Sequence, residues 1–337
     1  MLARGATVCS MSSSSWHRRP VHPGKRPNRL VFNLTVSEQR IATIFSPAKI
    51  NLFLAVTGLR TDGFHDLVSV AAPLHFGDQL IAVVDSGERN SPAQFSLECD
   101  VPDVPVDGSN LVLKAAAAFA AATGWGESVA FRLEKRIPVG AGLGGGSSNA
   151  TAALLALNQL SGADLDRATL GALAAAVGSD CPLFLGSGPV IMRGRGEQIE
   201  PLPETAVRRL RGRPLLIFKP GLSVSTAWAY GQMAAGAPRT YLPAEEAERR
   251  LSTWIAGSAD AVKLQFNNLE PVVFRKYLAL PVLLDRLRCR FGLAPGMSGS
   301  GSACFVALPP DAPIAEIVAV VRDAWGAGCF VRETAIS

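Results

Sequence analysis

A glycine-rich loop is the feature that most constrains how this chain of 337 residues can fold. Five of the seven residues from 140 to 146 are glycines, within the run Pro138-Val139-Gly140-Ala141-Gly142-Leu143-Gly144-Gly145-Gly146-Ser147-Ser148. Glycines let a backbone turn tightly and approach a ligand closely. The apolar residues of 149–160 predict a helix directly after the loop, capped by Ser147 or Ser148. Free N–H groups at a helix start bind phosphate, so the loop predicts a nucleotide site.

Two common nucleotide-binding loops do not fit this run. A Walker A loop ends in Gly-Lys-Ser/Thr, whereas this one ends in Gly146-Ser147-Ser148. A dinucleotide-binding fingerprint is formally present at positions 140, 142 and 145, with Asp164 further on. That fingerprint needs an acidic residue at the end of a second parallel strand. Here a second helix is predicted at 165–177 with Asp164 as its cap, so the fingerprint is not supported.

Charge and cysteine content exclude several other classes of protein. The net charge is +5, but residues 1–40 carry +6 and the remainder −1, so no basic stripe for nucleic acid is expected on the folded part. No apolar run is long enough to span a membrane. Residues 1–40 are expected to be a disordered basic leader, a transit peptide or an over-long start. The cysteines are scattered, which favours buried thiols over disulfides or a zinc site; they are Cys9, Cys99, Cys181, Cys289, Cys304 and Cys329.

Periodicity along the chain predicts mixed strands and helices. In the first part, strands are predicted at 44–56, 68–74, 79–84 and 129–133, and helices at 111–122, 149–160 and 165–177. In the second part, strands are predicted at 215–219, 303–308 and 330–334, and helices at 226–234, 245–255, 272–290 and 314–325, with a break at Pro281. Strands mixed with helix pairs indicate an α+β second domain of split βαβ type.

Three segments in the right order resemble the motifs of the GHMP kinases. The loop from Pro138 resembles the second motif of that superfamily, and Met297-Ser298-Gly299-Ser300-Gly301-Ser302 resembles the third. The first motif is matched by Lys49-Ile50-Asn51 followed by Asp62-Gly63-Phe64-His65. Its Lys-x-Asn and Asp-Gly-Phe-His are similar to the branch that phosphorylates 4-diphosphocytidyl-2-C-methyl-D-erythritol. The resemblance covers roughly residues 44–335.

The resemblance implies a two-domain α+β kinase. Its ribosomal-S5-like α/β domain would span residues 41–200, and its ferredoxin-like split βαβ domain residues 201–337. It implies a cleft between the domains in which ATP phosphorylates the 2-hydroxyl of the cytidyl compound, with Mg²⁺ held mostly by ATP and water. This reaction is a step of the methylerythritol phosphate route to isoprenoids. Mevalonate, phosphomevalonate or homoserine kinases, or a non-catalytic ligand-binding paralogue, are the alternatives. A cytoplasmic enzyme without nucleic-acid or membrane partners is expected, or a plastid one if the leader is a transit peptide; its oligomeric state is left open.

The resemblance also implies roles for individual residues. Asp180 would be the base that accepts the hydroxyl proton and Lys49 its partner, although Asp180 two residues before a proline fits a helix cap equally well. ATP would contact residues 138–148, with Asn110 and Lys135 at the border of its site.

The remaining predicted contacts concern the substrate. Asn51 and His65 would read the cytosine edge, Phe64 and Tyr230 would stack on the base, and Thr226 would contact the methylerythritol or diphosphate end. Residues 298–302 would either contact phosphates or brace the glycine-rich loop.

Overall fold

The computed structural model describes residues 40–84 and 93–337, and Gln39–Ser337 form one compact unit. Of the predicted basic leader at 1–40, all but Arg40 lies outside the described residues. Within the described ranges, no helix is long and apolar enough to cross a membrane.

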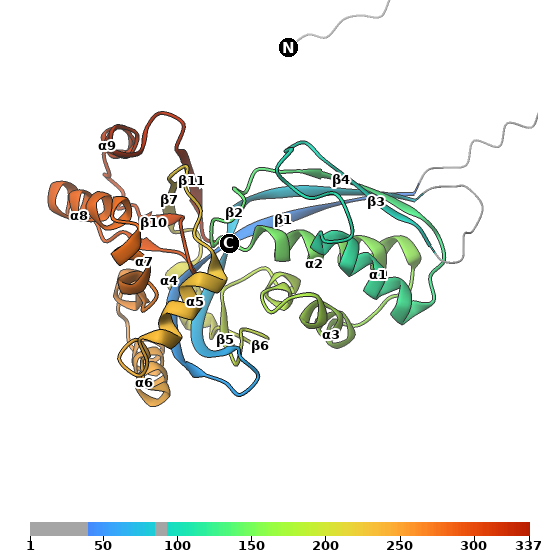
Figure 1. Cartoon of the computed structure of the whole chain (residues 1–337), viewed down its shortest axis with the longest axis horizontal. Coiled ribbons are helices and arrows are strands. Elements are labelled where there is room, and N and C mark those ends of the chain that lie inside the picture. The colour runs from blue at the N-terminus through green and yellow to red at the C-terminus, as the bar shows by residue number, and fades with distance from the viewer. Residues whose placement is uncertain (1–39, 85–92) are drawn as a thin grey trace, which may run out of the picture. The chain divides into compact units, whose positions relative to one another are not determined.

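The first sheet has the strand order β3-β4-β2-β1-β8, with β5 paired to β2 and β6 to β5 (Figure 1). Its strands are β1 (Ile41–Leu59), β2 (His65–Val84), β3 (Phe95–Cys99), β4 (Val129–Glu134), β5 (Val190–Arg193), β6 (Gln198–Pro201) and β8 (Phe266–Asn267). The strands predicted at 68–74 and 79–84 are one continuous strand, β2, because β1 pairs with it along nearly its whole length.

Strand β1 carries two polar side chains of the site in a short stretch between two irregularities of its pairing. The register with β2 shifts between Pro47 and Lys49 and again between Asn51 and Phe53. Because Lys49 and Asn51 are two residues apart in the regular stretch between these shifts, they share one face of the strand, while Ile50 and its apolar neighbours belong to the hydrophobic core.

Helices α1 (Leu111–Thr123), α2 (Gly145–Ser161) and α3 (Arg167–Val177) lie along one face of this sheet (Figure 1). The predicted caps of two of them were wrong. Helix α2 begins at Gly145, and its N-cap is Gly144 with a left-handed φ of 71°, not a serine. Helix α3 is capped by Asp166, which accepts from Thr169 N at 2.8 Å. Asp164 lies in the segment before α3, where the N–H of the following residue, Leu165, donates to Asn158 Oδ1 at 2.8 Å.

The second sheet is antiparallel, with the order β11-β7-β10-β9. Its strands are β7 (Pro214–Lys219), β9 (Gly296–Met297), β10 (Cys304–Ala307) and β11 (Phe330–Ala335). Around it are α5 (Thr226–Ala235), α7 (Glu270–Lys276), α8 (Ala279–Phe291) and α9 (Ile314–Trp325). The predicted helical break at Pro281 falls instead at Tyr277, the C-cap of α7. Pro281 lies in the first turn of α8, where a missing N–H costs no helical hydrogen bond.

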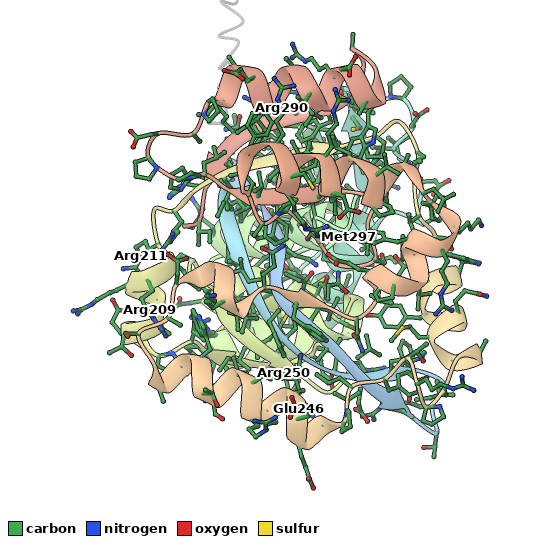
Figure 2. The ribbon with its side chains drawn as sticks, turned by 90° about the vertical axis from the view of Figure 1, so that its left-hand side faces the viewer. Arg209, Arg211, Glu246, Arg250, Arg290 and Met297 are labelled. Carbon is green, nitrogen blue, oxygen red and sulfur yellow. The ribbon has the colours of Figure 1, made fainter. Side chains whose placement is uncertain are left out.

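The two predicted domains are joined by more than one crossing of the chain. Strand β8 comes from the second half of the sequence but pairs with β1 in the first sheet, Phe53 opposite Phe266. The Leu242 N–H, also from the second half, donates to Val56 O of β1 at 3.1 Å. Within the second half itself, Arg209 ties α4 (Glu204–Leu210) to α6 (Ala244–Ala256), because its guanidinium donates to Trp254 O at 3.0 Å (Figure 2). The division into two domains at residue 200 stays a prediction.

Candidate active site

A cleft of about 1040 Å³ lies within the compact unit, lined by residues from both halves of the sequence. Its lining includes the glycine-rich loop, Lys49 and Asn51 of β1, the Phe64–His65 turn, and Thr226 and Tyr230 of α5. Such a volume accommodates ligands of nucleotide size.

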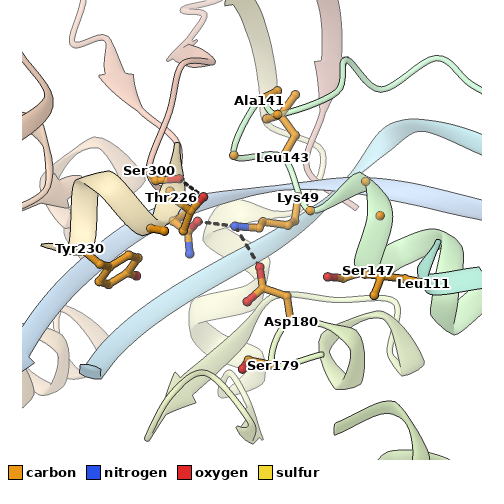
Figure 3. Close-up of a pocket in the computed structure, with 18 of the residues that line it drawn as sticks. Lys49, Leu111, Ala141, Leu143, Ser147, Ser179, Asp180, Thr226, Tyr230 and Ser300 are labelled. Carbon is orange, nitrogen blue, oxygen red and sulfur yellow. Dashed lines mark hydrogen bonds and ion pairs between the residues drawn. The ribbon is translucent and has the colours of Figure 1, made fainter. Parts of the chain in front are cut away.

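Lys49 and Asp180 face each other in this cleft (Figure 3). The distance from Lys49 Nζ to Asp180 Oδ2 is 3.6 Å, and the exposed fractions of the two side chains are 6% and 37%. Asp180 precedes the short 3₁₀ helix η1 (Cys181–Leu185), but its side chain makes no capping hydrogen bond. A purely capping role is therefore excluded, and the carboxylate is directed to the cleft.

The glycine-rich loop packs directly against this pair. The Lys49 N–H donates to Leu143 O at 2.9 Å. A Cβ atom at Gly144 would lie 2.9 Å from Lys49 Cγ and 2.9 Å from Phe184 Cζ, so only glycine fits there. The start of α2, with its unpaired backbone N–H groups, is thus beside the cationic and acidic side chains.

Residues 298–302 brace the glycine-rich loop from the opposite side. Ser298 Oγ donates to Gly142 O at 3.0 Å, and the Ala303 N–H donates to Ala141 O at 3.0 Å. Of the two predicted roles, the bracing one is confirmed by these contacts. Ser300 also lines the cleft, and its hydroxyl lies 2.8 Å from Thr226 Oγ1 (Figure 3).

A buried carboxylate, Asp78, anchors the other end of the loop. It accepts from the backbone N–H groups of Arg136 and Ile137 at 2.6 and 2.7 Å, and from Asn149 Nδ2 at 2.8 Å. It also forms an ion pair with Lys135, whose ammonium is buried beneath Gly145. Lys135 lines the cleft, but its charge is already paired by Asp78.

Aromatic rings gather at the far end of the cleft. The His65 ring lies 5.0 Å from the Tyr230 ring and 5.8 Å from the Tyr241 ring, between centroids. Burial lowers the pKa of His65, and its Nε2 atom is buried without a partner. Burial, with a smaller contribution from the nearby Asp180 charge, raises the pKa of Tyr230. Phe64 is half exposed, and the Arg195 guanidinium lies 4.7 Å from its ring centroid.

The structure brings nearly all predicted site residues to this cleft. The exception is Ser148, which is buried and accepts a hydrogen bond from Ser46 Oγ. Several residues that line the cleft, Lys135 among them, have side chains that already have protein partners. Asn110 caps α1 by accepting from Val112 N at 2.9 Å, and Asn51 bonds to Lys49 Nζ at 2.6 Å.

Among the residues missed from the sequence, three have polar or charged side chains at the cleft or behind it. Ser69 sits in a predicted strand and Asp78 directly before another, and neither belongs to a motif, so no local signal marked them. Arg195 belongs to the tight turn between β5 and β6, and its flanking glycines were the available signal. Among the described residues, no group of three or more His, Cys, Asp or Glu side chains could hold a metal ion.

Comparison with known proteins identifies the class of protein first. Two protein-family models match this chain. The model of the GHMP kinases N-terminal domain matches residues 110–188, and that of the GHMP kinases C-terminal domain matches residues 249–327. A homoserine kinase structure from Cytophaga hutchinsonii superposes with a TM-score of 0.65 at 16% identity, over 89% of this chain and 96% of that one, and shares the fold alone. The protein is a GHMP kinase with the expected α+β fold, and such kinases use ATP.

Closer relatives narrow the class to one family. A 4-diphosphocytidyl-2-C-methyl-D-erythritol kinase of Synechococcus sp. strain CC9902 is 40% identical over 78% of this chain and 86% of its own length. A crystal structure of 4-(cytidine 5'-diphospho)-2C-methyl-D-erythritol kinase, 35% identical, superposes with a TM-score of 0.67 over 88% of this chain and all of that one. The chain belongs to the 4-diphosphocytidyl-2-C-methyl-D-erythritol kinase family. The predicted family is confirmed, and the other GHMP kinases are not favoured.

Proposed function

We propose that this protein transfers the γ-phosphoryl group of ATP to the 2-hydroxyl of 4-diphosphocytidyl-2-C-methyl-D-erythritol, in the methylerythritol phosphate route to isoprenoid precursors. The observation that carries the proposal is the 3.6 Å approach of Lys49 Nζ and Asp180 Oδ2 beside the glycine-rich loop. Membership of the kinase family supports the choice of substrate.

In this proposal Asp180 accepts the proton of the attacking hydroxyl. Lys49 orients that hydroxyl and offsets the negative charge that develops on the transferring group. Backbone N–H groups of residues 140–147 hold the ATP phosphates, and Mg²⁺ carried by ATP screens their charge. Because phosphoryl transfer depends mainly on positioning and charge stabilisation, this set of groups is sufficient.

The aromatic end of the cleft is proposed to bind the cytosine base. Phe64 and Tyr230 offer ring faces, and stacking does not require a hydroxyl on residue 64. The partly buried His65 ring supplies a hydrogen-bonding edge at this end. Thr226 is proposed to contact the part of the substrate that lies between this end and Asp180, where its hydroxyl meets that of Ser300. The reaction is proposed to take place in the cytoplasm.

The test is turnover of the cytidyl compound with ATP, compared with homoserine and mevalonate. In Asp180→Asn, we expect kcat to fall by about 10²- to 10⁴-fold while the Kd of ATP stays within about twofold. Asp166→Asn is the matched control, because the same chemical change at an exposed helix cap preserves capping. Turnover of homoserine or mevalonate without turnover of the cytidyl compound contradicts the substrate, and unchanged kcat in Asp180→Asn contradicts the mechanism.

A further inference from the structure

We propose that Ser69 is a positioning residue of this kinase, which holds the Lys49 ammonium in place through the side-chain amide of Asn51. The inference rests on the proposed function, because it concerns how Lys49 is presented to the reaction. Ser69 lies on β2, the strand that pairs with β1, and its register partner Leu54 is three residues after Asn51.

The Ser69 hydroxyl fixes the direction of the hydrogen bonds that connect Ser69, Asn51 and Lys49. Ser69 Oγ donates to Phe53 O at 2.6 Å. A hydroxyl carries a single hydrogen, so Ser69 can only accept from Asn51. The atom that lies 2.9 Å from Ser69 Oγ is accordingly the amide nitrogen of Asn51, Nδ2. The Asn51 amide oxygen then faces the other way, 2.6 Å from Lys49 Nζ.

Burial makes this direction important. Ser69 is fully buried, and Asn51 and Lys49 are each only 5% exposed, so water is poorly placed to replace a lost partner. If the Asn51 amide turned over, its NH₂ group would face the Lys49 ammonium, and two donors would meet without an acceptor. In a buried site such a mismatch costs more than it would in water.

The backbone of Asn51 is held as well. Its N–H donates to Ser298 Oγ at 3.3 Å, and Ser298 in turn donates to Gly142 O in the glycine-rich loop. Asn51 is therefore fixed through its backbone by the bracing segment and through its side chain by Ser69. The geometry gives the Asn51 side chain the task of orienting Lys49, and the cytosine contact that the resemblance implies stays a prediction.

The consequence concerns how the three N–H groups of Lys49 are used. One points to Asn51 Oδ1 and a second toward Asp180 Oδ2. The third is left for the oxygen atoms of the reacting groups. Without the Asn51 acceptor, the torsion angles of the Lys49 side chain would be less restrained, and the position of its ammonium relative to Asp180 would no longer be fixed.

The experiment uses the full chain with Ser69→Ala, Ser69→Thr, Asn51→Leu and the Ser69→Ala/Asn51→Leu double variant. For Ser69→Ala we expect kcat to fall about tenfold with KM for both substrates within about twofold, because one buried hydrogen bond is lost. Ser69→Thr keeps the hydroxyl and should retain kcat within about threefold. If Ser69 acts through Asn51, the double variant is no slower than Asn51→Leu alone.

A second measurement does not depend on turnover. The ammonium protons of Lys49, observed by ¹⁵N NMR and assigned with Lys49→Arg, should exchange with water about fivefold faster in Ser69→Ala than in the parent protein. If the parent protein does not phosphorylate the cytidyl compound, the proposed function is refuted. The exchange rate still tests whether Ser69 positions the Lys49 ammonium. Unchanged kcat and exchange in Ser69→Ala, or multiplicative losses in the double variant, overturn the inference.

Discussion

The buried ion pair between Asp78 and Lys135 gives a quantitative test of how the glycine-rich loop is anchored. The perturbation is Asp78→Asn, which keeps the shape of the side chain but removes its charge. The amide oxygen of asparagine can still accept from the backbone N–H groups of Arg136 and Ile137. Lys135 loses its anion, however, and its ammonium remains buried.

The size of the effect follows from burial. Removing one partner of a buried ion pair costs about 3–5 kcal/mol of stability, because the other charge stays uncompensated. Unfolding entropy is about 2.1 cal/mol/K per residue, or roughly 0.6 kcal/mol/K for a unit of about 300 residues. Dividing the first quantity by the second predicts that Tm falls by about 5–8 °C.

The assay is thermal unfolding of the parent protein and four variants, followed by circular dichroism; the fourth variant is the single change Lys135→Met. Asp323→Asn is the matched control, since it removes the same charge from an exposed ion pair with Arg286 and should lower Tm by less than about 2 °C. The Asp78→Asn/Lys135→Met double variant removes both charges and should regain at least about half of the loss. A change below about 1 °C in Asp78→Asn, or a double variant as unstable as the sum of its single changes, would refute this reasoning.

Three further predictions concern the loop, the cleft and a buried thiol. Gly142→Ala should unfold at a lower temperature than Gly146→Ala by about 2–5 °C, because its Cβ atom would lie 2.3 Å from Ser298 O at a φ of +77°, whereas a Cβ atom at Gly146 would make only an ordinary contact, 3.7 Å from Leu111 Cδ1. Burial lowers the pKa of His65, so the unfolded chain takes up its proton first on acidification. Tm should therefore fall more steeply below about pH 6.5 in the parent protein than in His65→Asn. Burial raises the pKa of Cys181 to about 11, so iodoacetamide at pH 8 should label it only after unfolding, as mass spectrometry can show.

Local patterns in the sequence predicted the elements better than their ends. The glycine-rich loop was predicted as a phosphate-binding loop because its composition and the following helix lie together in the chain. The start of α2 was predicted four residues late, because Gly145 and Gly146 have low helix propensity and packing against Ile137 and Lys135 overrides it.

Contacts between distant segments are what the sequence left undecided. Asp180 fits both a cap and a base by its spacing to Pro182, and only its approach to Lys49 decides between them. Asp78 carried no motif, because its partners come from the end of β4 and from α2. The orientation of the Asn51 amide depends on a hydroxyl from β2, which no pattern within β1 could reveal.

The pairing of β8 with β1 has a consequence for synthesis of the chain. Phe266 and Asn267 complete the edge of a sheet whose first strand ends at Leu59, so that edge waits for most of the polypeptide to be made. At ribosomal speeds of about 5–20 residues per second, the delay is roughly 10–40 s. During that interval the nascent protein exposes an open strand edge to its neighbours, which is when chaperones would be most useful to it.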